Sequence, residues 1–223
     1  DGAPPERTLN IPNGIDLPRM QKVRAARGDE IPPVACLIGR VVPIKDVKTF
    51  LRAMRTLVNV LPEAEGWIAG PEDEDKDYAA ECRALVSSLG LEKNVEFLGF
   101  QKIDELLPKV GVIVLSSISE ALPLVLLEGF AAGVPAVSTD VGSCRQLIEG
   151  LDEEDRAFGK AGSVVGIADP EALGKAVAHL LKNPDTWHQA QQAGIRRVEN
   201  LYTQQQMFAS YRALYQGLLG EDS

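Results

Sequence analysis

Two acidic residues, Glu120 and Glu128, stand eight positions apart, and every residue between them is apolar. Glu120 follows a strand-like run at residues 112–115 and a serine-rich loop, and Pro123 stands where the first residue of a helix is expected. A helix N-terminus favours phosphate, and carboxylates beside it can bind the hydroxyls of whatever the phosphate carries. The alternative is a buried amphipathic helix with one solvated acid at each end.

Two cations precede these acids in the chain. Arg40 follows Gly39 at the end of an apolar run, and Lys45 lies near the start of the next helical pattern. Two cations and a helix N-terminus could together neutralise a diphosphate leaving group. The alternative is that both side chains are solvated at the surface. The chain has no glycine-rich dinucleotide motif after this run and no Walker loop, which argues against a nicotinamide-dependent enzyme and an ATPase.

The other polar clusters do not predict a site. The acidic run at residues 72–75 resembles a metal-binding cluster, but acids are favoured just before a helix, so we expect an exposed loop. His179 and His188 have no acidic or cysteine companions at metal or triad spacing. The three cysteines are far apart and odd in number, which fits buried thiols in a reducing compartment. We therefore expect no metal ion.

Composition limits the possible partners. The 223 residues are 45% hydrophobic and 25% charged, which is enough for a sizeable globular core. The net charge of −9 argues against binding to nucleic acid or to anionic membranes. No apolar run has transmembrane length and no signal peptide is present, so we expect a cytoplasmic protein. Because the chain begins with Asp1, we expect it to be a piece of a longer protein.

The elements that position these residues follow a regular alternation. Residues 1–33 are rich in proline and glycine and are interpreted as a linker. Short apolar strands then alternate with helical patterns, which predicts a doubly wound, Rossmann-like α/β domain with a parallel sheet. The candidate residues fall at the carboxyl ends of strands, where such sheets bind ligands. Strands are expected at residues 34–38, 66–69, 95–98, 112–115, 135–138 and 163–165; helices at 46–61, 78–89, 103–107, 123–132, 143–150 and in the tail from 169; and a loop at 151–162.

These features resemble, in order and over nearly the whole chain, the C-terminal domain of a retaining glycosyltransferase of family four with the GT-B fold. Each motif is weak alone, whereas the ordered set is specific. The segments at residues 41–48 and 70–75 resemble more closely the cytosolic transferases of Pel exopolysaccharide synthesis, which serves biofilms. The matching segments are Asn13-Gly14-Ile15-Asp16, Gly39-Arg40 with Lys45, Phe97-Leu98-Gly99-Phe100, Glu120 with Glu128, Ala132-Gly133-Val134-Pro135 and Thr139-Asp140-Val141-Gly142.

The resemblance implies a role for each candidate on the phosphate side. Arg40 and Lys45 would bind the diphosphate of a nucleotide sugar, most simply a UDP-sugar. Backbone N–H groups around Leu124 and Val125 would bind the same phosphates. The resemblance thus implies catalysis without a bound metal or other cofactor.

The resemblance also implies which residues bind the donor sugar and the nucleoside. Glu120 would contact the donor sugar and is the candidate for a catalytic role, although the placement of the two acids suits binding better than general acid and base work. Glu128 would hold the ribose hydroxyls. The loop at Phe100 and Gln101 would hold the base, largely through its backbone. Ala121 departs from the glycine that is frequent in the family, which leaves the local sugar contacts open.

The implied organisation is a GT-B enzyme whose active site lies between two domains. Residues 1–33 would be the interdomain linker, 34–200 the nucleotide-sugar domain, and 201–223 a C-terminal helix that packs on this domain or docks on a missing N-terminal domain. An inner-membrane polysaccharide synthase complex is a further implied partner. We expect this chain alone to bind nucleotide sugar and to transfer nothing.

Two other classes stay open from the residues alone. One is another nucleotide-sugar enzyme, such as an epimerase, which would share the phosphate site and both acids. The other is a non-catalytic nucleotide-binding or scaffolding module, because binding residues look alike in an enzyme and a module.

Overall fold

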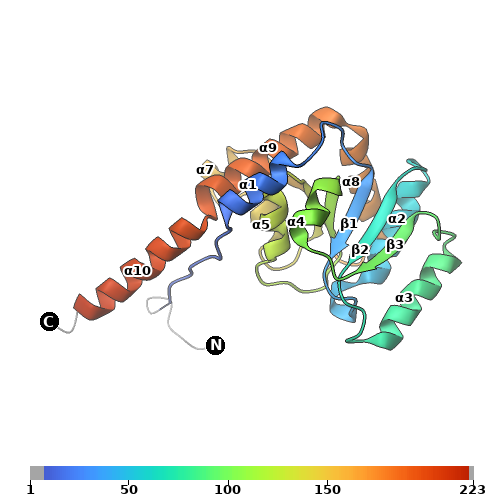
Figure 1. Ribbon diagram of the computed structural model, residues 1–223, viewed down its shortest axis with the longest axis horizontal. Coiled ribbons are helices and arrows are strands. Elements are labelled where there is room, and N and C mark those ends of the chain that lie inside the picture. The colour runs from blue at the N-terminus through green and yellow to red at the C-terminus, as the bar shows by residue number, and fades with distance from the viewer. Residues whose placement is uncertain (1–7, 221–223) are drawn as a thin grey trace.

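A six-stranded, wholly parallel sheet forms the centre of the protein (Figure 1). The computed structural model describes residues 8–220, with side chains to residue 217. The strand order is β3-β2-β1-β4-β5-β6, which confirms the predicted doubly wound α/β fold. Each strand end lies within one residue of its predicted position: β1 (Val34–Ile38), β2 (Glu65–Ala69), β3 (Val95–Gly99), β4 (Val112–Leu115), β5 (Ala136–Thr139) and β6 (Gly162–Val165).

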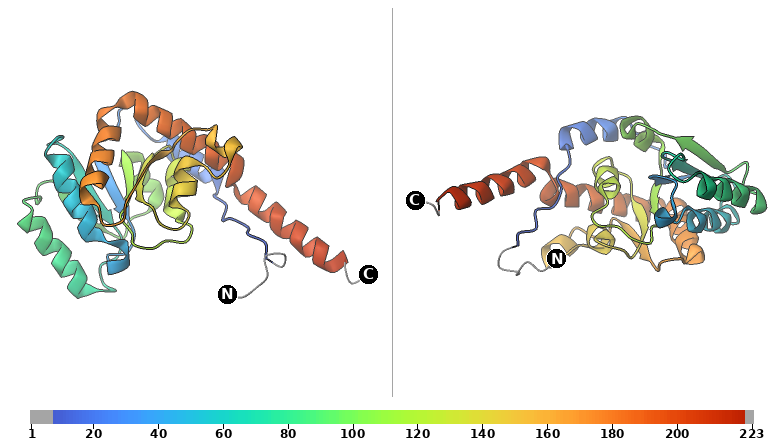
Figure 2. Two further views of the ribbon diagram at one scale, coloured as in Figure 1. Left: turned by 180° about the vertical axis from the view of Figure 1, so that it is seen from behind. Right: turned by 90° about the horizontal axis from the view of Figure 1, so that it is seen from below.

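Helices cover both faces of the sheet (Figures 1 and 2). Successive residues of β1 point to opposite sides, so that Val34 and Cys36 enter one apolar core and Ala35 and Leu37 the other. This explains why the strands are continuously apolar. The first core is covered by α1 (Leu17–Ala25), α4 (Ile103–Leu106), α5 (Leu124–Ala131) and α6 (Cys144–Glu149), the second by α2 (Val47–Val58), α3 (Lys76–Ser88) and α8 (Pro170–Lys182), and α9 (Pro184–Leu201) contributes to both.

The interpretation of residues 1–33 as a linker without packed elements is wrong for α1. The side chain of Asp16 caps this helix by accepting from the N–H of Arg19, and Met20 and Val23 are buried in the first core. Proline content was misleading here, because Pro18 lies in the first helical turn, where its missing N–H costs nothing. Residues 1–7 of that segment lie outside the described residues.

Local expectations also differ from the structure. The predicted loop at residues 151–162 contains a short helix, α7 (Glu153–Arg156), capped by the side chain of Asp152. The helix expected at residues 143–150 is α6, and the hydroxyl of Ser143, its N-cap residue, makes no capping hydrogen bond. Pro123 is the N-cap of α5 rather than its first residue.

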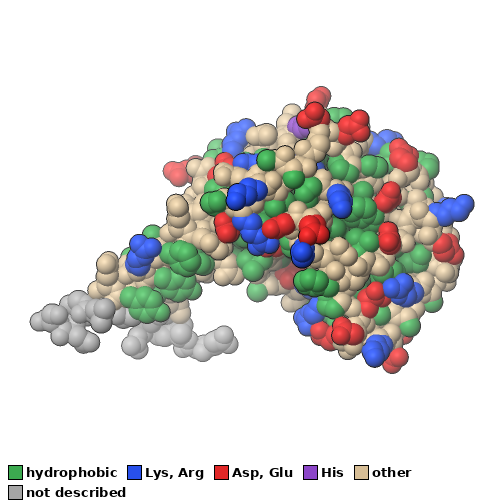
Figure 3. Space-filling view, viewed as in Figure 1, with side chains coloured by type: hydrophobic (Ala, Val, Ile, Leu, Met, Phe, Trp, Pro, Cys, Tyr) green, Lys and Arg blue, Asp and Glu red, His purple; other side chains and the backbone are tan. Residues whose placement is uncertain are grey.

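The last helix, α10 (Gln204–Gly220), projects away from the domain (Figures 1 and 2). Hydrophobic side chains gather along it in Figure 3, and Phe208, Tyr211 and Tyr215 are exposed. The sequence predicted this helix, and its docking on another domain stays a prediction. The predicted helix also included Leu218, whose side chain is not described, and residues 221–223, which lie outside the described residues. Among residues 8–220, no helix is both long and apolar enough to cross a bilayer.

Candidate functional site

A pocket of about 320 Å³ lies where the strand order reverses, between the carboxyl ends of β1 and β4. The chain moves outward from β1 through β2 to β3, and from β4 through β5 to β6, so the connections diverge at this point. Such a divergence leaves a crevice in open α/β sheets, which is the usual place for a ligand. The polar and helix-terminal residues that line it are Lys45, Ser116, Ser117, Glu120, Leu124 and Val125.

The loop that carries Lys45 is joined to the loop after β4. Lys45 ends a short 3-10 helix, Pro43–Lys45, and the next residue, Asp46, adopts the left-handed conformation with φ of 44°. The backbone carbonyl of Lys45 accepts a hydrogen bond of 2.8 Å from the hydroxyl of Ser116, and the N–H of Ile118 donates to the carbonyl of Ile44 at 2.9 Å. These bonds fix the cation-bearing loop against the acid-bearing loop.

Lys45 and Glu120 form an ion pair inside this pocket. The Nζ of Lys45 lies 2.6 Å from Oε1 of Glu120, and their side chains are only 24% and 13% exposed. The same carboxylate oxygen accepts a second hydrogen bond of 2.6 Å from the hydroxyl of Ser117. The structure therefore brings one predicted cation and one predicted acid together, with a serine that the sequence reasoning did not select.

The N-terminus of α5 forms another wall of the pocket. Pro123 is the N-cap and offers no side-chain hydrogen bond to the first turn, and Leu124 and Val125 line the pocket. The first N–H groups of a helix have no intrahelical acceptor, and the helix dipole places partial positive charge there. A phosphate oxygen would satisfy these donors beside Lys45.

Arg40 does not line the pocket that contains Lys45. Its guanidinium forms a 2.7 Å ion pair with Glu74, and both side chains are about half exposed, at 53% and 51%. Glu74 belongs to the acidic run for which an exposed loop was expected; of its neighbours, Glu72 pairs with Arg83 and Asp75 caps α3. Within the described residues, no group of three or more His, Cys, Asp or Glu side chains could hold a metal ion.

Glu128 lies on α5 in a different electrostatic environment. Burial raises the pKa of its carboxyl above the usual range, and the nearby Arg19 guanidinium partly opposes that rise. Arg19, from α1, is itself held by Asp104, from α4, through a 2.7 Å ion pair. Neither residue was selected from the sequence. Arg19 lies in the segment interpreted as a linker, although Asp16, the N-cap residue before a helical pattern, was an available signal for α1.

Phe100 and Gln101 follow β3 and do not line the pocket. The Phe100 side chain is 81% exposed. The amide Nε2 of Gln101 donates to the carbonyl of Leu98 at 2.8 Å, which closes the turn after the strand. The structure thus has a hydrogen-bonded turn at this position, and the aromatic ring of Phe100 is exposed to solvent.

Gly142, three residues after β5, lies close to the backbone of the acid-bearing loop. Its φ is +51°, and a Cβ atom at this position would lie 2.1 Å from the carbonyl oxygen of Glu120. The N–H of Ser143 also donates to the carbonyl of Ala121 at 2.9 Å. The side chain of Ala121, the residue that departs from the family pattern, is exposed.

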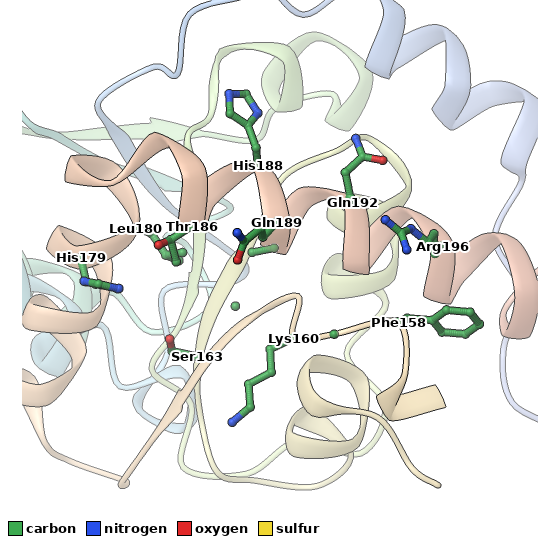
Figure 4. A pocket seen from close by; sticks show the side chains of 13 residues that line it. Phe158, Lys160, Ser163, His179, Leu180, Thr186, His188, Gln189, Gln192 and Arg196 are labelled. Atoms are coloured by element: carbon green, nitrogen blue, oxygen red, sulfur yellow. The ribbon is translucent and has the colours of Figure 1, made fainter. Parts of the chain in front are cut away.

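A larger cavity of about 720 Å³ lies elsewhere, beside the start of β6 and along α8 and α9 (Figure 4). It contains none of the predicted site residues, although His179 and His188 line it. In Figure 4, His188 and Lys160 point in opposite directions, and His179 stands apart from both. The polar side chains do not converge on one point, so size alone does not make this cavity the functional site.

Solved structures identify the class of this domain. It superposes on a sucrose-phosphate synthase from Thermosynechococcus elongatus with a TM-score of 0.76 and 26% identity, over 95% of this chain and 52% of that one. It superposes on Alr3699/HepE from Anabaena, solved in complex with UDP and glucose, with a TM-score of 0.77 and 19% identity, over 98% and 59%. The domain therefore has the Rossmann-like architecture of GT-B glycosyltransferases.

Sequence comparisons identify the family. The family model described as glycosyl transferases group 1 matches residues 20–197, and the chain belongs to this family. An exopolysaccharide phosphotransferase of Streptomyces coelicolor is 34% identical over 75% of this chain and 18% of its own length. The lipopolysaccharide core biosynthesis mannosyltransferase LpsB of Rhizobium meliloti is 26% identical over 95% of this chain and 62% of its own length. The chain thus spans less than two thirds of each relative.

Proposed function

We propose that this chain is the donor-binding domain of a glycosyltransferase that transfers a sugar from a nucleoside diphosphate sugar. The observation that carries the proposal is the Lys45–Glu120 pair beside the N-terminus of α5, which has no side-chain capping hydrogen bond, in the pocket where the strand order reverses. A diphosphate needs cationic and N–H donors, and a sugar needs a carboxylate that accepts from its hydroxyls. This pocket offers both within hydrogen-bond distance of each other.

The proposed roles follow from where each group lies. Lys45 and the N–H groups of Leu124 and Val125 bind the diphosphate, and Glu120 accepts from donor-sugar hydroxyls. Arg40 joins the diphosphate only after it leaves Glu74, because its guanidinium is paired there in the unliganded chain. Glu128 accepts from the ribose hydroxyls.

The turn at Phe100 and Gln101 completes the nucleoside side of the proposal by holding the base through its backbone. No metal ion is required in this account, because cations and helix N–H groups neutralise the leaving diphosphate. UDP binding that is unchanged by a chelator is expected; binding that is lost with the chelator and restored by magnesium would count against it.

The identity of the donor, the acceptor and the partners is also a proposal. The donor is a UDP-sugar, the acceptor is a growing exopolysaccharide of the Pel kind, and a second GT-B domain, contacted by α10, supplies the acceptor side. An inner-membrane synthase complex would then receive the product. The Pel-like segments at residues 41–48 and 70–75 support this choice. An exopolysaccharide-related name among the relatives is consistent with it.

Calorimetry with a nucleotide panel tests the proposal. UDP should bind more tightly than uridine and more tightly than ADP or GDP, and a radiolabelled UDP-sugar should show binding but no transfer by this chain alone. Absence of binding by every nucleotide would favour a scaffolding module. Robust transfer by the 223-residue chain would contradict the assignment as a donor-binding half.

A further inference from the structure

Buried hydroxyl groups connect β5 to the Lys45–Glu120 pair. Thr139, at the end of β5 and fully buried, donates from Oγ1 to the carbonyl of Ser117 at 2.7 Å. Ser117, which is 2% exposed, donates from Oγ to Oε1 of Glu120 at 2.6 Å. That oxygen is the one that pairs with Nζ of Lys45. The route therefore runs from a rigid strand, through one loop residue, to the ion pair.

The other partner of the ion pair is tied to the same loop. Ser116, 1% exposed, donates from its hydroxyl to the backbone carbonyl of Lys45. Consequently both the backbone of Lys45 and the carboxylate that holds its ammonium are positioned by residues 116 and 117.

These hydroxyls call for a reason beyond packing. A buried hydroxyl needs a hydrogen-bond partner, whereas a valine at position 139 would be buried without one but could not hold the carbonyl of Ser117. A lysine side chain has many rotamers, and its ordering opposes the binding of any ligand that it contacts. Groups that order the side chain in advance reduce this cost.

We propose that Ser117 and Thr139 are positioning residues that hold the Lys45 ammonium in the pocket through Glu120. Thr139 fixes the backbone of Ser117, Ser117 fixes one oxygen of Glu120, and that oxygen holds Nζ of Lys45. The binding consequence, a preorganised cation for a diphosphate, rests on the proposed function. The positioning itself does not, and it can be measured without a ligand.

The ligand-free experiment is competitive labelling of lysine amines, followed by mass spectrometry of the whole chain. Ser117→Ala and Thr139→Val should each raise the labelling rate of Lys45 about threefold to tenfold, the effect expected from one lost hydrogen bond. Thr139→Ser, which keeps the hydroxyl, should restore the wild-type rate. Lys48 is the internal reference, because it is also ion-paired, with Glu81, and 30% exposed.

Ser138→Ala is the matched control variant. Ser138 is fully buried on the same strand, but its hydroxyl donates to the carbonyl of Thr139 and not to the loop. Its labelling pattern should equal that of the wild type. If both Ser117→Ala and Thr139→Val leave the Lys45 rate unchanged, or if Ser138→Ala raises it equally, the positioning claim is overturned. Two independent variants are used so that misfolding of one does not remove the test.

A double-mutant cycle measures the binding consequence. Ser117→Ala should weaken UDP binding about threefold to tenfold in the wild-type background and leave it unchanged in a Lys45→Met background. An equal loss in both backgrounds would mean that Ser117 acts on the fold rather than on Lys45. If the wild-type chain binds UDP no better than uridine, the proposed function fails, and the labelling result still decides the positioning claim.

Discussion

Replacing Lys45 by methionine is expected to weaken the binding of UDP more than replacing Arg40 by methionine. Lys45 is three-quarters buried in the pocket, whereas Arg40 is half exposed and must leave Glu74 to reach a ligand. A charge-assisted hydrogen bond contributes about 1.5–3 kcal/mol, which corresponds to about 10- to 150-fold in affinity for Lys45. Breaking the exposed Arg40–Glu74 ion pair costs about 0.2–1 kcal/mol, so the factor by which Arg40 increases the affinity for UDP should be about 1.5- to 5-fold smaller than the factor for Lys45.

The same reasoning predicts that Glu74→Gln tightens UDP binding, by up to about fivefold, because it releases Arg40. Isothermal titration calorimetry with UDP and with uridine measures both effects, and the ratio of the two affinities removes contributions from the nucleoside. Glu72→Gln is the control, since it frees Arg83 from a similar surface pair and should leave the ratio unchanged. Weaker UDP binding in Glu74→Gln, or equal losses for UDP and uridine in Lys45→Met, would refute the reasoning.

Three further predictions concern the framework and the ribose side. Arg197 in α9 forms a fully buried ion pair with Asp155 in α7. Arg197→Met should lower the free energy of unfolding in urea by about 3–5 kcal/mol, because it leaves the buried carboxylate of Asp155 without its cation; a loss below about 1 kcal/mol would contradict the buried pair. Gly142→Ala should weaken UDP binding, since its Cβ would lie 2.1 Å from the carbonyl oxygen of Glu120, whereas Gly159→Ala, also at positive φ but 3.5 Å from its nearest neighbour, should not. Glu128→Gln should raise the unfolding midpoint at neutral pH and weaken uridine binding. Burial raises the pKa of the Glu128 carboxyl in the folded state, so the folded state loses stability as the pH rises through the unfolded-state pKa, and the loss is complete above the folded-state pKa. A wild-type chain that lost stability on acidification through this window, relative to the variant, would contradict this prediction.

The strands were predictable because burial on both faces makes them continuously apolar, and glycines such as Gly39 and Gly70 end them. At Gly70 the reason is steric, since a Cβ there would lie 1.9 Å from the carbonyl oxygen of Gly39. The helix α1 was not predicted because proline content was taken as a sign of a linker, although Pro18 occupies the first turn of that helix. Composition describes a segment poorly when its prolines lie at helix starts.

The candidate site was predictable only in part. Glu120 and Lys45 could be selected because each follows a strand, and parallel strands end at the same edge of the sheet. The ion pair of Arg40 with Glu74 depends on how the loop after β1 packs against the loop after β2. The spacing of residues along the chain does not predict that packing. Thr139 was missed for the same reason, because its hydroxyl donates to the carbonyl of Ser117, 22 positions earlier in the chain. Ser117 was missed although its partner Glu120 is only three positions away, because a serine in a loop shows no pattern that marks its hydrogen bond.

The central claim is that a nucleoside diphosphate binds between β1 and β4, at the N-terminus of α5. Backbone amide chemical shifts measured during a titration with UDP test this most directly. We expect the largest shifts at Lys45, at residues 116–120 and at Leu124 and Val125, with residues 158–163 and α9 unaffected. Shifts confined to residues 158–163 and α9, around the larger cavity, would contradict it.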